Sequence, residues 1–583
     1  MAANITAETL SKNHKSISIA EFFEKNKHLL GYENLQKSLL TCIREAVDNS
    51  LDACEEARIL PDIYLEIQKV PDKTDSFKII IEDNGPGIIK ANIPRVFGKL
   101  LYGSKFHRLK QSRGQQGIGI SAAVLYAQLT TGKATKVYSK TGDGNIHIYE
   151  LRIDTSKNEP EIITETTLDG YEGTGTRIEM FIKGRYSRGK QSIPEYLQET
   201  AIMNPYARII YTDPEGEKFD FERVVESLPE ESKEIKPHPA GLQLGVLIRM
   251  LDVSKTKNLT GFLSEEFSRM GRTAISEIIL ISQLAGKTKP KKITREEADK
   301  LLSAMQKVKI QNPPTNCLSP VGSDAIKEGI KKELRPEFIS SVTRPPAVYQ
   351  GNPFLIEVGI AYGGNLEKEG PAKLFRYANK VPLLYEQSAC AITKSVLQND
   401  WKRYHLKQSA NSLPIGPLAI SIHIASVWVP YTSEGKEAIA SYPVIIKEVK
   451  LAIQEAGRKL SSYLGKKKKA GLQEQKKSIF ARYIGEISGA LSDLTEVPKE
   501  QIDVKMNELL EAKIGEIGGS VTDLQDEDFK KDKEDGLLST TTKKEIKQEQ
   551  EEQEENTKNS PPRQATLIDN YIPSDDIESE NNE

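Results

Sequence analysis

Cysteine is scarce in this chain, and the other marks of a secreted or membrane protein are missing too. Only four of the 583 residues are cysteine, and their spacing matches neither a disulfide framework nor a clustered metal site: Cys42, Cys54, Cys317 and Cys390. They suit buried thiols in a reducing cytoplasm. No apolar run reaches the roughly 20 residues of a membrane span, and no signal-peptide pattern is present. We therefore expect a cytoplasmic protein without a membrane partner.

An excess of charge of one sign is also missing. The 81 lysine and arginine residues nearly balance the 83 aspartate and glutamate residues, which leaves a formal net charge of -2. No global positive charge points to DNA, so DNA binding would have to depend on local basic clusters. The chain is long enough for several domains that each bury a core.

The first motif lies on a predicted amphipathic helix over residues 34–54. Glu45 and Asn49 are four residues apart and share one face of it. A carboxylate at Glu45 can accept a proton from a water that attacks a phosphate, and the amide oxygen of Asn49 is a hard ligand suited to Mg²⁺. Taken alone, the pair is better explained as part of a solvated helix edge. The apolar face of the helix is formed by Leu35, Leu39, Ile43 and Val47.

The second and fourth motifs each adjoin a predicted strand. A β-branched run over 77–83 ends at Asp83, whose carboxylate can accept a hydrogen bond from an exocyclic base amine. Gly85 and Gly87 follow and allow the backbone to approach a ligand closely. Thr176 precedes an alternating strand over 177–182 and can support Asp83. Each motif alone also fits an ordinary turn beside a strand.

The third motif is rich in glycine and opens a predicted helix. Backbone N–H groups at a helix N-terminus form an anion site, and Ser104, Lys105 and Arg113 lie upstream where they can close over phosphates. No strand directly precedes the run, and the P-loop pattern is absent, so neither a dinucleotide fold nor a P-loop is predicted. A lone run of this kind also fits a flexible surface loop. Its residues are Gly114, Gln115, Gln116, Gly117, Ile118, Gly119 and Ile120.

In this order the four motifs resemble the Bergerat ATP site of gyrase-type ATPases, one class of heat-shock chaperones, MutL-type repair proteins and histidine kinases. The resemblance implies that ATP and Mg²⁺ are the cofactors, with Glu45 as the general base and Asn49 as the metal ligand. It also implies that Asp83 reads adenine and that residues 114–120 belong to the phosphate lid. A histidine kinase is disfavoured, because the segment before the pocket is too short for a histidine-bearing dimer hairpin.

Longer stretches are similar to the B subunits of type IIB DNA topoisomerases, the topoisomerase VI family. These stretches are 44–53, 101–106, 113–117, 237–239 and 312–318, and the resemblance covers most of the chain to about Leu464. It implies that Lys436, in the loop 431–436, is a switch lysine that reaches the terminal phosphate. A lysine is a compact charge suited to a phosphate, although a solvated loop lysine is the alternative.

The resemblance implies a multidomain α+β chain. We expect a Bergerat-fold ATPase sandwich with an N-terminal strap over 1–229 and a helix–two-turn–helix insert over 237–311. An α/β transducer with a long helix follows over 312–470, and a further helical segment over 471–515. The basic run 286–292 can contact DNA phosphates or simply be solvated. Composition predicts a disordered acidic tail over 516–583.

Two patterns predict the end of the transducer. An alternating strand is expected over 418–424, and an apolar stripe predicts a long helix that ends at the lysine run 466–469. A second helix is expected from Lys476 to about Gly515, with one apolar side that can dock a partner subunit. That side is formed by Ile479, Tyr483, Ile484 and Ile487.

The expected function is ATP-gated passage of one DNA duplex through a break in another. None of the 21 tyrosines is marked as a nucleophile by its context, and the acidic run 526–528 does not follow a strand. We therefore expect cleavage by a separate A subunit in an A₂B₂ assembly at the nucleoid, together with an ATP-dependent B–B homodimer and double-stranded DNA. The alternative is a non-cleaving ATP clamp or chaperone.

One apolar island in the tail has its own hypothesis. Residues 564–572 resemble a sliding-clamp-binding peptide, with Leu567 and Tyr571 at two of its anchor positions. Asn570 replaces the usual first aromatic residue. A chance cluster in a disordered tail explains the same residues.

Overall fold

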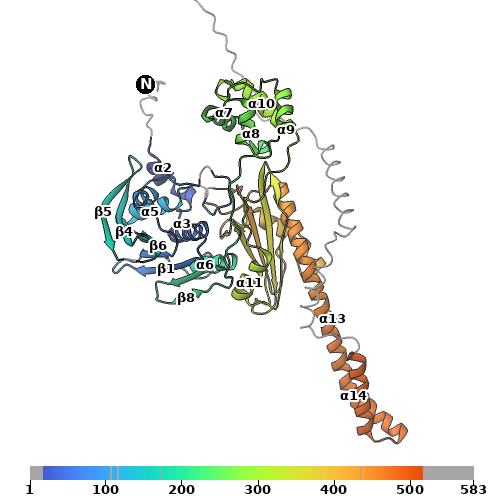
Figure 1. The fold of residues 1–583 in the computed structure, drawn as a ribbon. Helices are drawn as coiled ribbons and strands as arrows, with labels where there is room; N and C mark the ends of the chain where they lie inside the picture. The colour runs from blue at the N-terminus through green and yellow to red at the C-terminus, as the bar shows by residue number, and fades with distance from the viewer. Residues whose placement is uncertain (1–16, 106–107, 115–116, 171, 434, 516–583) are drawn as a thin grey trace, which may run out of the picture. The chain divides into compact units, whose positions relative to one another are not determined.

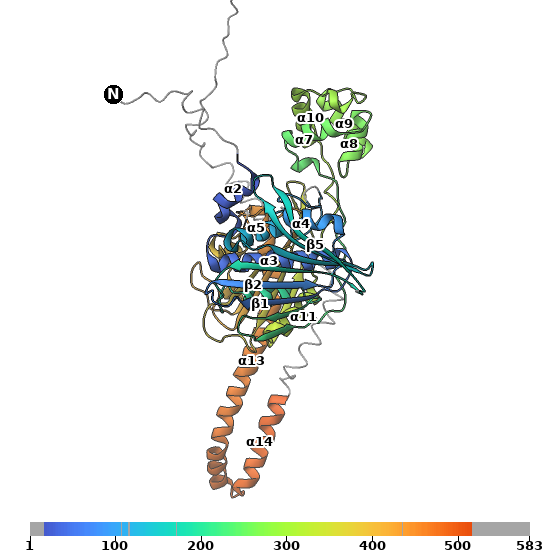
Figure 2. The same ribbon diagram turned by 90° about the vertical axis from the view of Figure 1, so that its left-hand side faces the viewer.

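A computed structural model describes residues 17–105, 108–114, 117–170, 172–433 and 435–515 of the chain. The chain divides into two compact units between Lys466 and Lys467 (Figures 1 and 2). The predictions for Gln115, Gln116 and the tail from residue 516, including 526–528 and 564–572, lie outside the described residues. Within the described part, no helix has the length and apolar character needed to cross a membrane.

The first sheet of the larger unit has eight strands in the order β5-β4-β3-β6-β2-β1-β7-β8. All neighbours are antiparallel except β1 and β7. The predicted strands 77–83 and 177–182 are confirmed as β2 and β6, which pair so that Asp83 lies opposite Thr176. The bounds are β1 Asp62–Lys69, β2 Ser76–Asp83, β3 Thr135–Thr141, β4 Asn145–Asp154, β5 Glu159–Asp169, β6 Thr174–Lys183, β7 Arg208–Thr212 and β8 Lys218–Phe221.

Two helices of this region carry the candidate site. The predicted helix 34–54 is confirmed as α3 (Leu35–Glu56), which begins where the Asn34 side chain accepts a hydrogen bond from the backbone N–H of Lys37. Helix α5 (Gly119–Thr131) packs against α3, and both contribute to one apolar core with the sheet (Figure 1). The remaining helices are α2 Ile19–Asn26, η1 Lys27–Leu30, η2 Lys90–Asn92, α4 Ile93–Gly98 and α6 Ile193–Met203.

A small helical region follows the first sheet and has its own apolar core. Thr294 and Glu297 form a reciprocal capping box that starts its last helix. The predicted break near 286–292 is confirmed, since that stretch holds only the short η4. The elements are η3 Pro239–Gly241, α7 Leu244–Val253, α8 Leu259–Glu266, α9 Arg272–Ser282, η4 Pro290–Lys292 and α10 Arg295–Lys307.

The second sheet has the strand order β10-β11-β14-β12-β13, and β9 also pairs with β11. Helix α13 covers one face and α11 lies on the other. The elements are α11 Ser323–Leu334, β9 Phe338–Thr343, β10 Ala347–Tyr349, β11 Asn352–Tyr362, β12 Lys373–Ala378, β13 Val381–Pro382, η5 Gln387–Ala389, α12 Ala391–Leu397, η6 Trp401–Tyr404, β14 Leu418–Ser426 and α13 Pro443–Thr495.

Strand β14 confirms the predicted strand 418–424, and both of its faces are covered. All nine of its residues are buried. Its isoleucines face the core beneath α13, whereas Ala419 and Ala425 belong to other apolar clusters on the opposite side. Isoleucines face one covered side of the strand, and small or polar residues face the other. His423 is one of these buried polar residues.

The lysine run does not end the long helix, so that prediction is wrong. Helix α13 continues through 466–469 to Thr495, and the second helix is α14 (Lys499–Gly515). Lysine is a good helix former and 466–475 contains no proline, so the run ends only the buried apolar stripe. Farther along, Ile484 is buried, while three residues predicted to share its side are exposed: Ile479, Tyr483 and Ile487.

Candidate functional site

Helix α3 presents Glu45 and Asn49 on its partly exposed edge, opposite the residues that pack on the sheet. The Asn49 side-chain amide donates a 2.7 Å hydrogen bond to the backbone oxygen of Glu45 one turn earlier. This bond orients Asn49 Oδ1 away from its own helix. No described residue donates to Oδ1, so a single hard oxygen ligand remains available there.

The Glu45 carboxylate lies among positive groups. Burial raises its pKa, but Lys436, Arg44 and Lys105 together hold that pKa below its usual value. Arg44 also contacts Oε1 at 3.2 Å. On the other side, any Cβ added to Gly119 would lie 1.9 Å from Oε2. The positive N-terminal end of α5 therefore lies directly against an ionised carboxylate, and only glycine fits there.

Asp83 is buried at the end of β2 and holds three hydrogen bonds. Ser50 Oγ donates to Oδ2 at 2.8 Å, and the backbone N–H groups of Gly85 and Thr176 donate to Oδ1 at 2.9 and 3.2 Å. Burial raises the pKa of Asp83, and these three donors oppose that rise. The carboxylate is thus fixed in orientation at the end of β2.

Gly87 forms the turn after Asp83 at a very close backbone approach. It has φ of 75°, and an added Cβ would lie 2.0 Å from the carbonyl oxygen of Lys140. Ser139 locks the same turn, because its hydroxyl accepts from the N–H of Ile88 at 2.7 Å and donates to the oxygen of Ile88 at 2.9 Å. Glycine is therefore required here by the close approach of the Lys140 carbonyl oxygen, whereas the predicted approach to a ligand stays a prediction.

The described part of the glycine run leads into α5 without a side-chain cap. Ile118 occupies the N-cap position and makes no capping hydrogen bond with any described residue, while Gly117 is left-handed with φ of 59°. The N–H of Gly114 lies 3.4 Å from Asp52 Oδ2. Uncapped N–H groups at the start of a helix are free to bind an anion. Gly119 and Ile120 are the first two helical residues.

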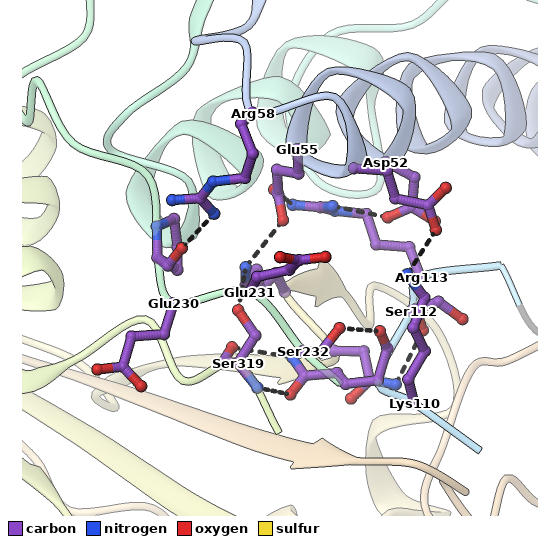
Figure 3. Close-up of a pocket in the computed structure, with 15 residues that line it drawn as sticks. Asp52, Glu55, Arg58, Lys110, Ser112, Arg113, Glu230, Glu231, Ser232 and Ser319 are labelled. Carbon is purple, nitrogen blue, oxygen red and sulfur yellow. Dashed lines mark hydrogen bonds and ion pairs between the residues drawn. The ribbon is translucent and has the colours of Figure 1, made fainter. Parts of the chain in front are cut away.

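The three residues predicted to close over phosphates, Arg113, Lys105 and Ser104, differ in burial and in their partners. Arg113 is buried, with Nη1 2.8 Å from Asp52 Oδ1 and Nη2 paired with Glu55 (Figure 3). Lys105 pairs with the second oxygen of Asp52. Ser104 is exposed. The positive charges of Arg113 and Lys105 are therefore engaged by carboxylates of α3 in this arrangement.

Lys436 comes to this site from the second sheet region, 323 positions away from Arg113. Its loop is closed by an isolated bridge between Tyr431 and Ile439. The side chain is almost fully buried, and Nζ donates to the backbone oxygen of Arg113 at 3.5 Å. The next residue, Glu437, pairs with Lys37 of α3. The structure thus brings Lys436 close to Glu45 and to the segment that leads into the glycine run, residues 108–114, which we call the lid base.

The comparisons with known proteins agree over most of the chain. Residues 37–182 match the family model of histidine kinase-, DNA gyrase B- and HSP90-like ATPases, and residues 313–476 match the topoisomerase VI B subunit transducer. The type 2 DNA topoisomerase 6 B subunit of Methanosarcina barkeri is 50% identical over 84% of this chain and 79% of its own length. The protein of the same name from Archaeoglobus fulgidus is 49% identical, over 85% of this chain and 82% of its own length. The one from Pyrococcus furiosus is 41% identical, over 87% of this chain and 96% of its own length.

The chain belongs to the family of type 2 DNA topoisomerase 6 B subunits. As a topoisomerase 6 B subunit it is part of an ATP-dependent type II DNA topoisomerase, and its N-terminal region has an ATP-binding fold. This membership decides against the non-cleaving clamp or chaperone that the motifs alone left open.

Sequence reasoning missed four residues of this topoisomerase 6 site. Ser50 fixes Asp83, and the pair Asp52 and Glu55 holds Arg113. Asp52 and Glu55 are three residues apart, so their common helix face was readable, but their arginine partner was not. The fourth residue is Lys380, whose Nζ lies 3.0 Å from Glu55. The asparagine before it is typical of a tight turn, but it does not indicate that the lysine side chain is buried.

Proposed function

We propose that ATP binds between α3, the turn after β2 and the start of α5, and that Glu45 is the general base for its hydrolysis. The observation that carries this assignment is the Glu45 carboxylate itself. It has a lowered pKa, lies beneath an uncapped helix N-terminus, and is influenced by Lys436 from another sheet. An ionised carboxylate in this place can take the proton of a water aligned with the terminal phosphate.

Other residues have supporting roles in this proposal. Asp83 accepts from the exocyclic amine of adenine, and Thr176 and Ser50 keep its carboxylate oriented. Asn49 Oδ1 would hold Mg²⁺, which neutralises phosphate charge when bound. Among the described residues no cluster of three or more His, Cys, Asp or Glu side chains is arranged as a metal site, so this metal would depend on one amide oxygen and on phosphate oxygens.

The lid residues surround the phosphates in the same proposal. The N–H groups of the glycine run, from Gly114 to Ile120, bind phosphate oxygens, with Gln115 and Gln116 on the same loop. The start of α5 must move when nucleotide enters, because Gly119 leaves no room for one carbon atom against Glu45. Ser104, Lys105 and Arg113 surround the same entrance, although the two charged groups must first exchange their carboxylate partners.

Lys436 then links hydrolysis to the second sheet. Its Nζ leaves the backbone oxygen of Arg113 for the terminal phosphate, and it returns when that phosphate is released. Such order–disorder of a contact with the terminal phosphate is how other nucleotide switches couple chemistry to movement.

The assembly is also a proposal. The relatives are named as B subunits, so we propose a separate A subunit that cleaves DNA, an A₂B₂ complex that acts on double-stranded DNA, and an ATP-dependent B–B dimer. The helical region over 237–311 is the proposed DNA-contacting insert, with the basic stretch 286–292 as one contact.

The Glu45→Gln variant tests the base. With the A subunit and supercoiled DNA, we expect ATP binding to persist while ATP hydrolysis falls by about 100-fold or more, because the base is lost. Multiple-turnover relaxation should fall with it. The matched control is Glu161→Gln on the exposed side of β5. Full turnover by Glu45→Gln would show that another group accepts the proton.

A further inference from the structure

The turn between β12 and β13 places a buried lysine at the base of the lid. The Lys380 side chain is 3% exposed, and its Nζ lies 3.0 Å from Glu55 Oε2 and 3.5 Å from Ser319 Oγ. Burial lowers the pKa of Lys380, and the negative charge of Glu55 opposes that shift. A buried ammonium is costly unless it is paired, so this contact specifies where the turn must lie.

The backbone of this turn is held in a conformation that lysine seldom adopts. Asn379 and Lys380 have φ of 48° and 70°, the two left-handed residues of a tight hairpin turn. The Asn379 side chain exchanges two 2.9 Å hydrogen bonds with the backbone of Ser426 on β14. The backbone N–H of Lys380 donates to His423 Nε2 at 2.9 Å. Surrounding contacts therefore determine the turn.

His423 connects the turn to the centre of the second sheet. Because a backbone N–H always donates, Nε2 must carry the lone pair, which leaves the proton on Nδ1. Nδ1 lies 2.8 Å from Glu357 Oε2, and both side chains are fully buried. Glu357 also accepts from the N–H groups of Val321 and Gly322 at 2.9 and 2.8 Å.

On the other side the turn contacts the lid base. The Asn379 amide donates to the backbone oxygen of Ser112 at 2.9 Å, one residue before Arg113. Glu55 bridges Lys380 to the Arg113 guanidinium, which Figure 3 shows between Glu55 and Asp52. Burial raises the pKa of Glu55, but Arg113 and Lys380 hold it at about 2, so the bridge is charged throughout the neutral range.

We propose that Lys380, acting through Glu55, is a positioning residue that keeps the lid base fixed to the second sheet whether or not nucleotide is bound. Two lysines of that region then act on opposite ends of Arg113, Lys436 by direct contact and Lys380 through Glu55. Lys436 contacts its carbonyl oxygen and is free to exchange it for a phosphate, while the Lys380–Glu55 contact holds the guanidinium. This inference rests on the proposed function of Lys436 and adds a fixed second contact to it.

The test uses the full chain with the A subunit on supercoiled DNA and compares Lys380→Met with wild type. We expect KM for ATP to change by less than about 3-fold while kcat for hydrolysis and the relaxation rate fall by about 10-fold, because the lid closes in the wrong place. Lys380→Arg should restore most of kcat. The double variant Lys380→Met with Glu55→Gln should be no worse than Glu55→Gln alone, since Lys380 acts through Glu55, which also holds Arg113.

Hydrogen exchange of the lid base, with and without an ATP analogue, separates the two lysines. Exchange over residues 108–114 should be faster in Lys380→Met in both states. Lys436→Met, which loses its contact with the Arg113 carbonyl oxygen, should in addition lose the change in exchange that the analogue causes in wild type. Lys373→Met, exposed at the start of the same strand β12, is the matched control. Thermal unfolding reports whether each variant folds.

The outcomes distinguish the inference from the function beneath it. Wild-type hydrolysis together with unchanged kcat and unchanged exchange in Lys380→Met overturns the role of Lys380 and leaves the proposed function standing. A rise in KM with unchanged kcat also overturns it, because that pattern belongs to nucleotide binding. A wild-type complex that binds but never hydrolyses ATP overturns the proposed function first.

Discussion

Neighbouring side chains of helix α3 contact different partners. Asn49 and Glu45 lie on the nucleotide edge, Ser50 reaches Asp83 of β2, and Asp52 holds Arg113. The partners of Ser50 and Asp52 come from distant segments of the chain. One helix therefore aligns Asp83, Glu45 and Arg113, three residues of the proposed ATP site, with respect to one another.

The contact between Ser50 and Asp83 gives the first prediction at this scale. Ser50→Ala removes a 2.8 Å hydrogen bond to a buried carboxylate, a contact that contributes about 1.5 kcal/mol or more. We expect KM for ATP to rise by about tenfold with little change in kcat, measured by steady-state hydrolysis. Ser156→Ala, on an exposed turn, is the control. A fall in kcat at unchanged KM would instead place Ser50 in the chemical step.

Asp48 gives a pH prediction. Burial raises its pKa to about 7 from an ordinary value of 3.8, and Glu45 adds to that rise against Arg113 and Arg44. Between these two values the unfolded chain has lost the proton that the folded chain retains. The contribution of Asp48 to the free energy of unfolding is therefore present below the ordinary pKa and declines as pH rises to about 7.

The Asp48→Asn variant removes this titration. We expect the Tm of wild type to decline more than that of Asp48→Asn from about pH 5 to about pH 7, followed by thermal unfolding at several pH values. Asp75→Asn, at an exposed loop position, should keep the wild-type slope. Parallel curves for wild type and Asp48→Asn would show that Asp48 is ionised in the folded protein.

At the scale of elements, helix α13 is longer than the apolar pattern that predicted it. The apolar stripe of α13 is buried from Ile445 to Leu464, and the helix itself continues for another 31 residues to Thr495. The end of the apolar stripe marks where the helix stops packing on the second sheet. The helix itself continues because lysine, glutamine and alanine favour helix formation. The stripe and the helix therefore have different ends.

A proline in the middle of α13 tests its continuity. Ala470→Pro should remove a backbone hydrogen bond and cost about 3 kcal/mol of local helix stability, against about 1 kcal/mol for Ala470→Gly. We expect lower helical circular dichroism and slower DNA relaxation in Ala470→Pro, with ATP affinity unchanged. Identical spectra for the two variants would favour the break at the lysine run that the sequence alone suggested.

For the whole molecule, nucleotide binding and assembly should be linked. We expect a non-hydrolysable ATP analogue to shift the isolated chain from monomer to dimer in sedimentation velocity, because in the proposed function the start of α5 and Lys436 change their contacts when nucleotide binds. Asp83→Asn, which loses the base-reading carboxylate, should remain monomeric at the same analogue concentration. ADP is the control ligand. A dimer that forms equally well without nucleotide would separate assembly from ATP.

Local sequence determined most of the elements and the identity of the site. The helix 34–54, the strand that ends at Asp83, the strand 177–182 and the helix that follows the glycine run were predicted from periodicity and glycine placement, and the structure has all of them. The order of four motifs was enough to indicate a Bergerat site, because each motif is a local arrangement of a few residues.

Only the tertiary structure decided which charges meet. Lys436 reaches Arg113 across 323 positions, and Lys380 reaches Glu55 across 325, because the second sheet packs beside α3. Periodicity assigns a residue to a face of its own helix or strand, but it carries no information on what is packed against that face. For the same reason the sequence marked Arg113 and Lys105 as positive groups near the lid, whereas only the fold showed that α3 carboxylates already hold them.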